Sequence, residues 1–260
     1  RHVRFEVGTY RHGENKGRAV IFKKIGREQV VLAEFDTVQE AREYLQANEA
    51  ALVAKLEKFK EIPNHRKESN SPRVGADHRN GADVTPDQFM EAFGFRGVEF
   101  GNYVEQGRRQ ADLNRAYDAL MDLAGVLNVP SKAMSLNGEL GLAFGARGTG
   151  GKDAPAAHYE PGKIVINLTK KEGAGSLAHE WVHALDNYFA RNRKDKDGYL
   201  SEKAYERGEG VRPEVVEAFA ELRRAVNKTR MQQRSKILDR TKTKDYWQTG
   251  AEMSARAFES

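Results

Sequence analysis

Residues 173–189 read GAGSLAHEWVHALDNYF and contain the stretch HEWVH at positions 179–183. Residues four apart on a helix lie one turn above each other, so His179 and His183 can both offer a ring nitrogen to one ion. Glu180 lies beside the first histidine. Another stripe of the same helix is apolar and consists of Leu177, Trp181, Leu185 and Tyr188. A ligand face separated from an apolar face in this way is typical of a zinc-binding helix that packs on a core.

The segments before this helix indicate a small sheet covered by helices. Residues 138–147 and 163–168 (KIVINL) read as strands, and the intervening residues 148–162 read as a flexible connection. Residues 108–130 have apolar side chains at helical spacing. Thr85 and Gln88 form a capping box that begins an earlier helix. The sequence therefore predicts an α+β fold of zincin-like type, with the active helix packed on a small mixed sheet.

A smaller module precedes this domain. Thr37 and Glu40 form a capping box for one long helix that extends to about residue 60. Three short β-branched or alternating runs come before it, at 3–7, 19–23 and 30–35. We therefore expect a βββα accessory module over 1–60, a linker or extended arm over 61–84, and the zincin-like domain over 85–260.

The composition restricts the metal chemistry and the compartment. The 260 residues include no cysteine, so a zinc ion must be held by His, Asp or Glu, and a reducing cytoplasm is consistent with this usage. The chain has no apolar run long enough to span a membrane. It opens on RHVRFEVG, without an apolar signal core, and stops within a helix-like pattern. We expect a piece of a longer cytoplasmic polypeptide.

Positive charge is concentrated near the C-terminus. The stretch 223–244 contains nine Lys or Arg residues and one acid, Asp239. Such a stretch could bind DNA phosphates or an acidic partner, and the alternative is a solvated helix face.

The third metal ligand decides the class of site. A catalytic zinc ion keeps three protein ligands and one open position. One candidate is Asp186, on the same helix face as His183. The other is Glu252, within the helix-like segment 251–260, and the sequence favours it. Asp186 would then accept the far N–H of a ligand histidine or cap the helix end. In a zinc hydrolase Glu180 would take the proton of the attacking water and pass it to the leaving amine.

Longer motifs resemble a known family, the large polyvalent protein-associated domains of zincin-like metallopeptidase type. They are FRGVEFGNYV (95–104), LNRAYDAL (113–120), SLNGELGLAFGARGTGG (135–151), AHYEPGKIVINLTK (157–170), GAGSLAHEWVHALDNYF (173–189) and YWQTGAEMSARAFE (246–259). The resemblance implies a domain of a large multidomain protein from a phage, prophage or conjugative element, acting in the host or recipient cell. It also implies the upstream βββα module.

The resemblance further implies an activity and additional site residues. HExxH with a distal glutamate is similar to the gluzincins, and the ExxAxxF form to the ImmA/IrrE-like peptidases. The implied function is a zinc metallopeptidase that cleaves a cytoplasmic protein, with the substrate extended along strand 163–168 as a sheet edge. Transition-state donors are then expected among His158, Tyr159, Arg147 and Tyr246. The alternative is a nucleic-acid or protein docking module on a catalytically inactive zincin scaffold, and a third reading is a structural metal site closed by a fourth ligand.

Overall fold

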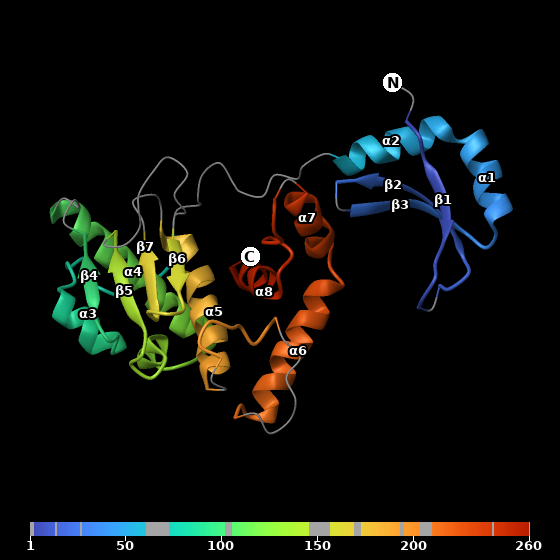
Figure 1. Cartoon of the computed structure of the whole chain (residues 1–260). Helices are drawn as coiled ribbons and strands as arrows, with labels where there is room; N and C mark the ends of the chain where they lie inside the picture. Colours follow the sequence, from blue (N-terminus) through green and yellow to red (C-terminus); the bar gives the residue numbers. More distant parts are fainter. Residues whose placement is uncertain are drawn as a thin grey trace. The chain divides into compact units, whose positions relative to one another are not determined.

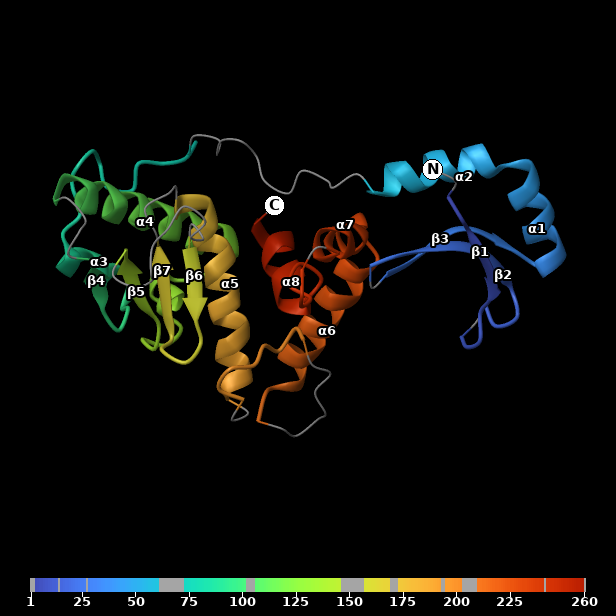
Figure 2. The same cartoon turned by 45° about the horizontal axis from the view of Figure 1, so that its top comes forward.

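The computed structural model describes residues 3–13, 15–26, 28–60, 73–101, 106–145, 157–168, 173–192, 195–202, 210–240 and 242–259. These residues form an α+β fold, which confirms the predicted class (Figures 1 and 2). Internal contacts divide the chain into two units. Unit 1 consists of residues 1–66 and 230–248, and unit 2 of residues 67–229 and 249–260. Residues 230–248, which we expected within the C-terminal domain, group with the N-terminal module.

Unit 1 is built on a three-stranded antiparallel sheet in the order β1-β2-β3. The strands are β1 (Glu6–Thr9), β2 (Ala19–Ile25) and β3 (Glu28–Phe35). The first strand begins later than predicted, and the other two lie where the alternation placed them. The sheet and its helices share a core whose most buried members include Ile21, Leu32, Leu52 and Leu56.

The prediction of one long helix in this module is wrong, because the structure has two helices there. Helix α1 (Val38–Ala47) begins at the predicted Thr37–Glu40 capping box, and α2 (Glu49–Lys60) follows after one residue. Asn48 separates them because its backbone N–H and its side-chain amide both donate to the carbonyl oxygen of Tyr44. An asparagine that caps a carbonyl in this way competes with continuation of the helix.

Helix α7 (Arg230–Asp239) completes unit 1. Just beyond it, Arg240 donates from Nη1 to the carbonyl oxygen of Phe59, at 2.9 Å. Its guanidinium carbon also lies 4.0 Å from the centroid of the Phe59 ring. This cation–π contact ties the segment to the end of α2.

Unit 2 contains a four-stranded sheet in the order β4-β5-β7-β6. The strands are β4 (Val98–Phe100), β5 (Gly141–Phe144), β7 (Val165–Leu168) and β6 (Ala157–Glu160). The first three are parallel, and β6 runs antiparallel to β7.

Two expectations about this sheet are corrected. Residues 157–160 were expected in a flexible connection, but they form β6, and a tight turn in which Ile164 donates its N–H to the Glu160 carbonyl connects β6 to β7. Strand β7, within the KIVINL segment, was expected at an edge, but it is paired on both sides. The edge strand beside the helix that carries His179 and His183 is β6.

The described helical elements of unit 2 are α3 (Pro86–Phe93), α4 (Gln106–Leu127), a 3₁₀ turn (Ser131–Ser135), α5 (Gly173–Arg191), α6 (Pro213–Asn227) and α8 (Gly250–Glu259). Among the described residues, all of these elements except α6 share one contiguous core with the sheet. The Thr85–Gln88 capping box is present. No helix in the described ranges is sufficiently long and apolar to cross a membrane.

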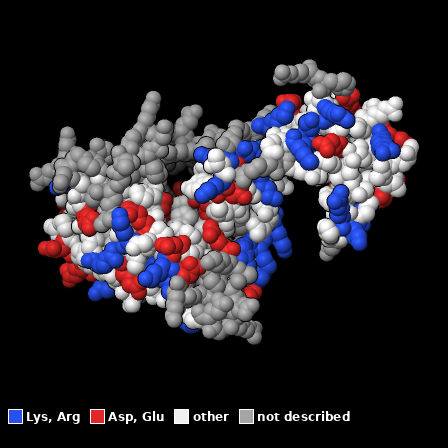
Figure 3. Space-filling view, in the orientation of Figure 1, with Lys and Arg blue, Asp and Glu red and all other residues white. Residues whose placement is uncertain are grey.

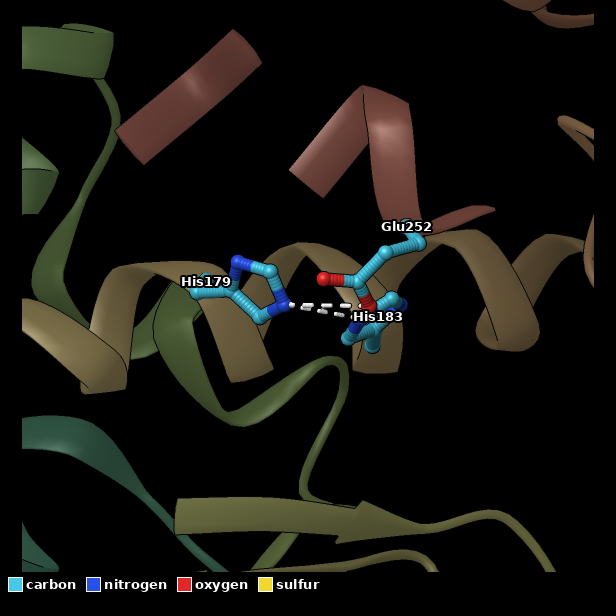
Figure 4. A group of neighbouring side chains, drawn as sticks. All are labelled: His179, His183 and Glu252. Carbon is cyan, nitrogen blue, oxygen red and sulfur yellow. Dashed lines mark hydrogen bonds and ion pairs between the residues drawn. The ribbon is translucent and has the colours of Figure 1, made fainter. Parts of the chain in front are cut away.

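The rotation of α5 about its axis is fixed by its apolar stripe. Leu177 and Trp181 are buried in the core, and the indole N–H of Trp181 donates to the carbonyl oxygen of Met134 at 2.9 Å. Because that face of α5 is buried in the core, His179 and His183 face α8, which packs along α5 (Figure 4).

Candidate metal centre

Three side chains from two helices converge in unit 2. His179 and His183 come from α5 and Glu252 comes from α8 (Figure 4). The Nε2 atoms of the two histidines lie 3.1 Å apart. The Oε2 atom of Glu252 lies 3.6 Å from Nε2 of His179 and 3.5 Å from Nε2 of His183. Three ligand-type atoms therefore point at one small volume.

These separations fit a zinc ion. Zinc binds imidazole nitrogen and carboxylate oxygen at about 2.0–2.2 Å with tetrahedral geometry, which places neighbouring ligand atoms about 3.3–3.6 Å apart. The three separations of 3.1, 3.5 and 3.6 Å lie close to that range. Two imidazoles and one carboxylate also match the donor types that zinc takes in catalytic sites.

The sequence of α8 explains how Glu252 reaches α5. Thr249 caps this helix, since its Oγ1 accepts the backbone N–H of Glu252 at 3.3 Å. Glu252 therefore lies in the first helical turn, where the helix dipole favours a negative charge. Ala251 and Ala255 are buried, and their small side chains allow α8 to pack closely against α5.

The ligand candidates form a buried charged cluster. Burial raises the pKa of Glu252, but hydrogen bonds to His179 and His183 outweigh it, so the pKa is lowered well below the usual value. Burial lowers the pKa of His179, but the carboxylates of Glu252 and Glu259 outweigh it and raise the pKa. Without a metal ion this arrangement favours a His179 cation beside a Glu252 anion.

Glu180 lies beside this cluster and remains outside it. Its side chain is buried, and burial raises its pKa, although His183, His179 and the backbone N–H of Tyr159 act in the opposite direction. A carboxylate whose pKa is raised is a stronger base than an ordinary one, which suits a general base. The hydrogen bond to Tyr159 places Glu180 next to the edge strand β6.

Asp186, the alternative third ligand, has other partners. It is 1% exposed, and its carboxylate accepts hydrogen bonds from the backbone N–H and the hydroxyl of Ser201. Burial raises its pKa to about 6. Within the described part of the chain, the group of ligand atoms that lie within 4.8 Å of one another contains His179, His183 and Glu252 and does not include Asp186. Among the same residues, the buried Nδ1 of His183 has no hydrogen-bond partner, so Asp186 does not accept its N–H either.

The four residues predicted as transition-state donors do not form one group in the described structure. The Tyr159 hydroxyl donates to Oδ1 of Asn187 at 2.7 Å and accepts from Arg191 at 3.0 Å. His158 lies on β6, with Nε2 3.4 Å from the carboxylate of Glu160. Arg147 lies outside the described residues. Tyr246 belongs to unit 1, where the residue is 52% exposed and its ring contacts Trp247.

Two residues near the centre were missed from the sequence. Glu259 places Oε2 3.1 Å from Nδ1 of His179. It lies two helical turns after Glu252, so the spacing of the two glutamates was a usable signal. The ring of Tyr199 lies 5.6 Å from the ring of His183. Tyr199 follows α5 in a charged loop without periodicity, and no pattern in the sequence marks it.

The basic stretch 223–244 is divided between the two units. Residues 223–229 belong to unit 2 and residues 230–244 to unit 1. Asp239, its single acid, is 1% exposed, and its carboxylate accepts backbone N–H groups of Tyr246, Trp247 and Gln248 at 2.9–3.0 Å. The negative charge of the stretch is therefore turned inward.

The fold and the site together define an α+β protein with a candidate mononuclear metal centre of two histidines and one glutamate. Residues 1–92 match the family model of large polyvalent protein-associated domain 5. This match associates the N-terminal part of the chain with large polyvalent proteins. It covers the βββ sheet, α1, α2 and most of α3, and it stops before the metal centre. No curated protein and no solved structure matches the chain.

Proposed function

We propose that unit 2 is a zinc-dependent metallopeptidase domain of a large polyvalent protein, with His179, His183 and Glu252 as the metal ligands. One observation carries the proposal: three ligand atoms from two helices lie at separations of 3.1–3.6 Å. A tetrahedral zinc ion requires two imidazoles and a carboxylate at separations close to these. A zinc ion held there would supply Lewis acidity to a water molecule and to a substrate carbonyl.

The residues around this position suit peptide hydrolysis. Glu180 is adjacent to the ligands without belonging to them, and burial raises the pKa of its carboxyl group. It would hold the proton removed from water and return it to the leaving amine. Strand β6 forms the edge of the sheet, and an extended peptide can add to such an edge through backbone hydrogen bonds. This edge replaces the KIVINL strand as the proposed substrate ledge.

Metal analysis and a peptide library test the proposal together. Anomalous scattering at the zinc edge should place one ion between His179, His183 and Glu252. The chain should cleave peptides in a proteome-derived library, read by mass spectrometry. Glu180→Gln should retain zinc and lose cleavage. Zinc bound elsewhere, or equal cleavage by the Glu180→Gln variant, would contradict the proposal.

A second function is favoured for unit 1, namely binding of nucleic acid. Unit 1 carries 19 Lys and Arg against 12 Asp and Glu, a net charge of +7, whereas unit 2 carries 24 against 26, a net charge of −2. Arg230, Arg234, Lys236, Lys242 and Lys244 are all exposed. Figure 3 shows Lys and Arg gathered over the N-terminal module, with both signs of charge mixed over α3–α5. Phosphate backbones are attracted by such a surface, and the exposed ring of Tyr246 offers a stacking face for a base.

Fluorescence anisotropy with a labelled single-stranded DNA 20-mer tests this second function. We expect affinity that falls steeply with salt and is reduced in a Lys236→Gln, Lys242→Gln, Lys244→Gln triple variant. A triple variant of exposed lysines in unit 2 (Lys132→Gln, Lys163→Gln, Lys196→Gln) removes the same charge and should bind as the wild type does. Equal loss in both triple variants, or binding of polyglutamate in preference to DNA, would exclude a nucleic-acid surface on unit 1.

A further inference from the structure

Residues 195–202, here called the strap, follow α5 and fold back along it. The side-chain amide of Asn187 donates to two strap carbonyls, those of Lys196 at 3.1 Å and Gly198 at 2.8 Å. Asp186, the residue before Asn187, accepts hydrogen bonds from the backbone N–H of Ser201, at 2.9 Å, and from the Ser201 hydroxyl. Two consecutive side chains of the ligand-bearing helix therefore hold both halves of the strap.

The strap also touches the beginning of α8. A Cβ atom placed on Gly250 would lie 2.6 Å from the carbonyl oxygen of Ser201 and 3.4 Å from the Cα of Glu202. Only glycine tolerates so close an approach of two backbones. Gly250 is the first residue of α8 and lies two positions before Glu252. Ser201 is thus in contact with α5 through its N–H and hydroxyl and with α8 through its carbonyl.

Between these contacts with α5 and α8, Tyr199 of the strap packs its ring against His183. The ring centroid of Tyr199 lies 5.6 Å from that of His183, in an edge-on arrangement at 61°. Leu200 is 2% exposed, so the strap is embedded at this point. The Nε2 atom of His183 faces His179 and Glu252, whereas its Nδ1 has no hydrogen-bond partner among the described residues, so ring packing restrains the imidazole on that side.

We propose that Asp186 is a positioning residue of the metal centre, acting through Ser201 to set the distance between α5 and α8 and through Tyr199 to orient His183. This inference rests on the metal centre proposed above. It gives Asp186 a role distinct from both sequence expectations, since it is neither a ligand nor the acceptor of a histidine N–H. It also explains why a carboxylate is buried beside the centre without entering it: its bonds are used to fasten the strap.

Zinc affinity of the folded, metal-free chain tests the proposal, measured by competition with a chromophoric chelator. Residues that orient metal ligands are typically worth about 10–100-fold in affinity. We expect Asp186→Ala to weaken zinc binding by a factor in that range. Asp186→Asn should recover part of the loss, because its amide oxygen still accepts the Ser201 N–H. Gly250→Ala should weaken binding comparably, because it separates α8 from the strap without altering a ligand.

Two matched variants separate positioning from general stability. Asp118 is another buried carboxylate of unit 2, held by Arg79, and Asp118→Ala should lower the free energy of unfolding but leave zinc affinity within about twofold of wild type. Gly125 lies in α4 with open space around it, so Gly125→Ala should bind zinc normally. The visible spectrum of the Co²⁺-loaded chain should change with Asp186→Ala and Gly250→Ala and with neither control.

The outcomes distinguish this inference from the metal centre itself. If wild type binds zinc, His179→Ala does not, and folded Asp186→Asn and Gly250→Ala bind as wild type, then the strap has no positioning role and the centre stands. If wild type binds no zinc, or His179→Ala binds it equally well, both the centre and the strap proposal are overturned. If Asp186→Ala does not fold, Gly250→Ala is the decisive variant.

Discussion

Oε2 of Glu252 lies 3.6 Å from Nε2 of His179, although the two residues belong to different helices and the chain passes through unit 1 between them. The pair is buried, with side-chain exposures of 6% and 11%. A buried carboxylate or imidazole is costly unless it is paired, and here each side chain is a partner of the other across the two helices.

Removal of the α8 carboxylates should lower zinc affinity to different extents. Glu252→Gln replaces a proposed ligand, and we expect a loss greater than about 100-fold, above the range typical of residues that only orient ligands. Glu259→Gln removes the acceptor 3.1 Å from Nδ1 of His179, and we expect a smaller loss of about tenfold. Chelator competition measures both. The reverse order of losses would identify Glu259 as the ligand.

Zinc binding should release a proton at neutral pH. In the metal-free chain the carboxylates of Glu252 and Glu259 overcome the effect of burial and raise the pKa of His179, so its ring is protonated, whereas a ligand imidazole must be neutral. Affinity should therefore increase as pH rises through neutrality. Calorimetry in buffers of different ionisation enthalpy should give about one proton released per zinc ion. Proton release that is the same in His179→Ala would locate the proton elsewhere.

Asp186 should make the stability of the metal-free chain depend on pH. Burial raises its pKa to about 6, from the ordinary 3.8 of an aspartate. The native state therefore binds more protons than the unfolded state between these values, and the free energy of unfolding falls as pH rises through that window. A shift of this size corresponds to roughly 3 kcal/mol. Urea unfolding at pH 4 and pH 7 should show this fall in wild type, and Asp186→Asn should remove it. A parallel pH profile in the variant would assign the dependence to other groups.

Tyr159→Phe distinguishes a structural role from a catalytic one. Its hydroxyl is shared between Asn187 and Arg191, and Arg191 in turn donates to Glu139 at 2.9 Å. Loss of a buried hydroxyl from this network should cost about 1–2 kcal/mol of unfolding free energy. Zinc affinity should be unchanged. Unchanged stability combined with impaired peptide cleavage would instead support the transition-state role inferred from the family resemblance.

Local patterns in the sequence predicted much of the fold. Both capping boxes, the strands at 19–23 and 30–35, and the apolar stripe of α5 are found in the structure, because each depends on neighbouring residues along the chain. The break at Asn48 was missed because an asparagine can either continue a helix or cap a carbonyl. Strand β6 was missed because its alternation of buried and partly exposed positions covers only the four residues AHYE, between a Gly-rich segment and Pro161-Gly162.

For the site, the sequence marked the residues that chemistry requires and missed those that packing supplies. The spacing of His179 and His183 is visible in five letters, and Glu252 was chosen over Asp186 from the helical pattern around it. The structure brings His179, His183 and Glu252 together, whereas the carboxylate of Asp186 accepts a hydrogen bond from Ser201. No spacing rule could reveal that contact or the ring of Tyr199 beside His183, since both depend on how a loop without periodicity folds back on α5.

The order of the segments along the chain has a consequence for biosynthesis. A ribosome delivers both histidines first, then the segment 230–248 that completes unit 1, and only afterwards α8 with Glu252. The nascent chain therefore has two of the three candidate ligand groups while residues 184–251 are added. The candidate metal centre is completed only after the segment 230–248 has been translated, so any activity that depends on it is withheld until then.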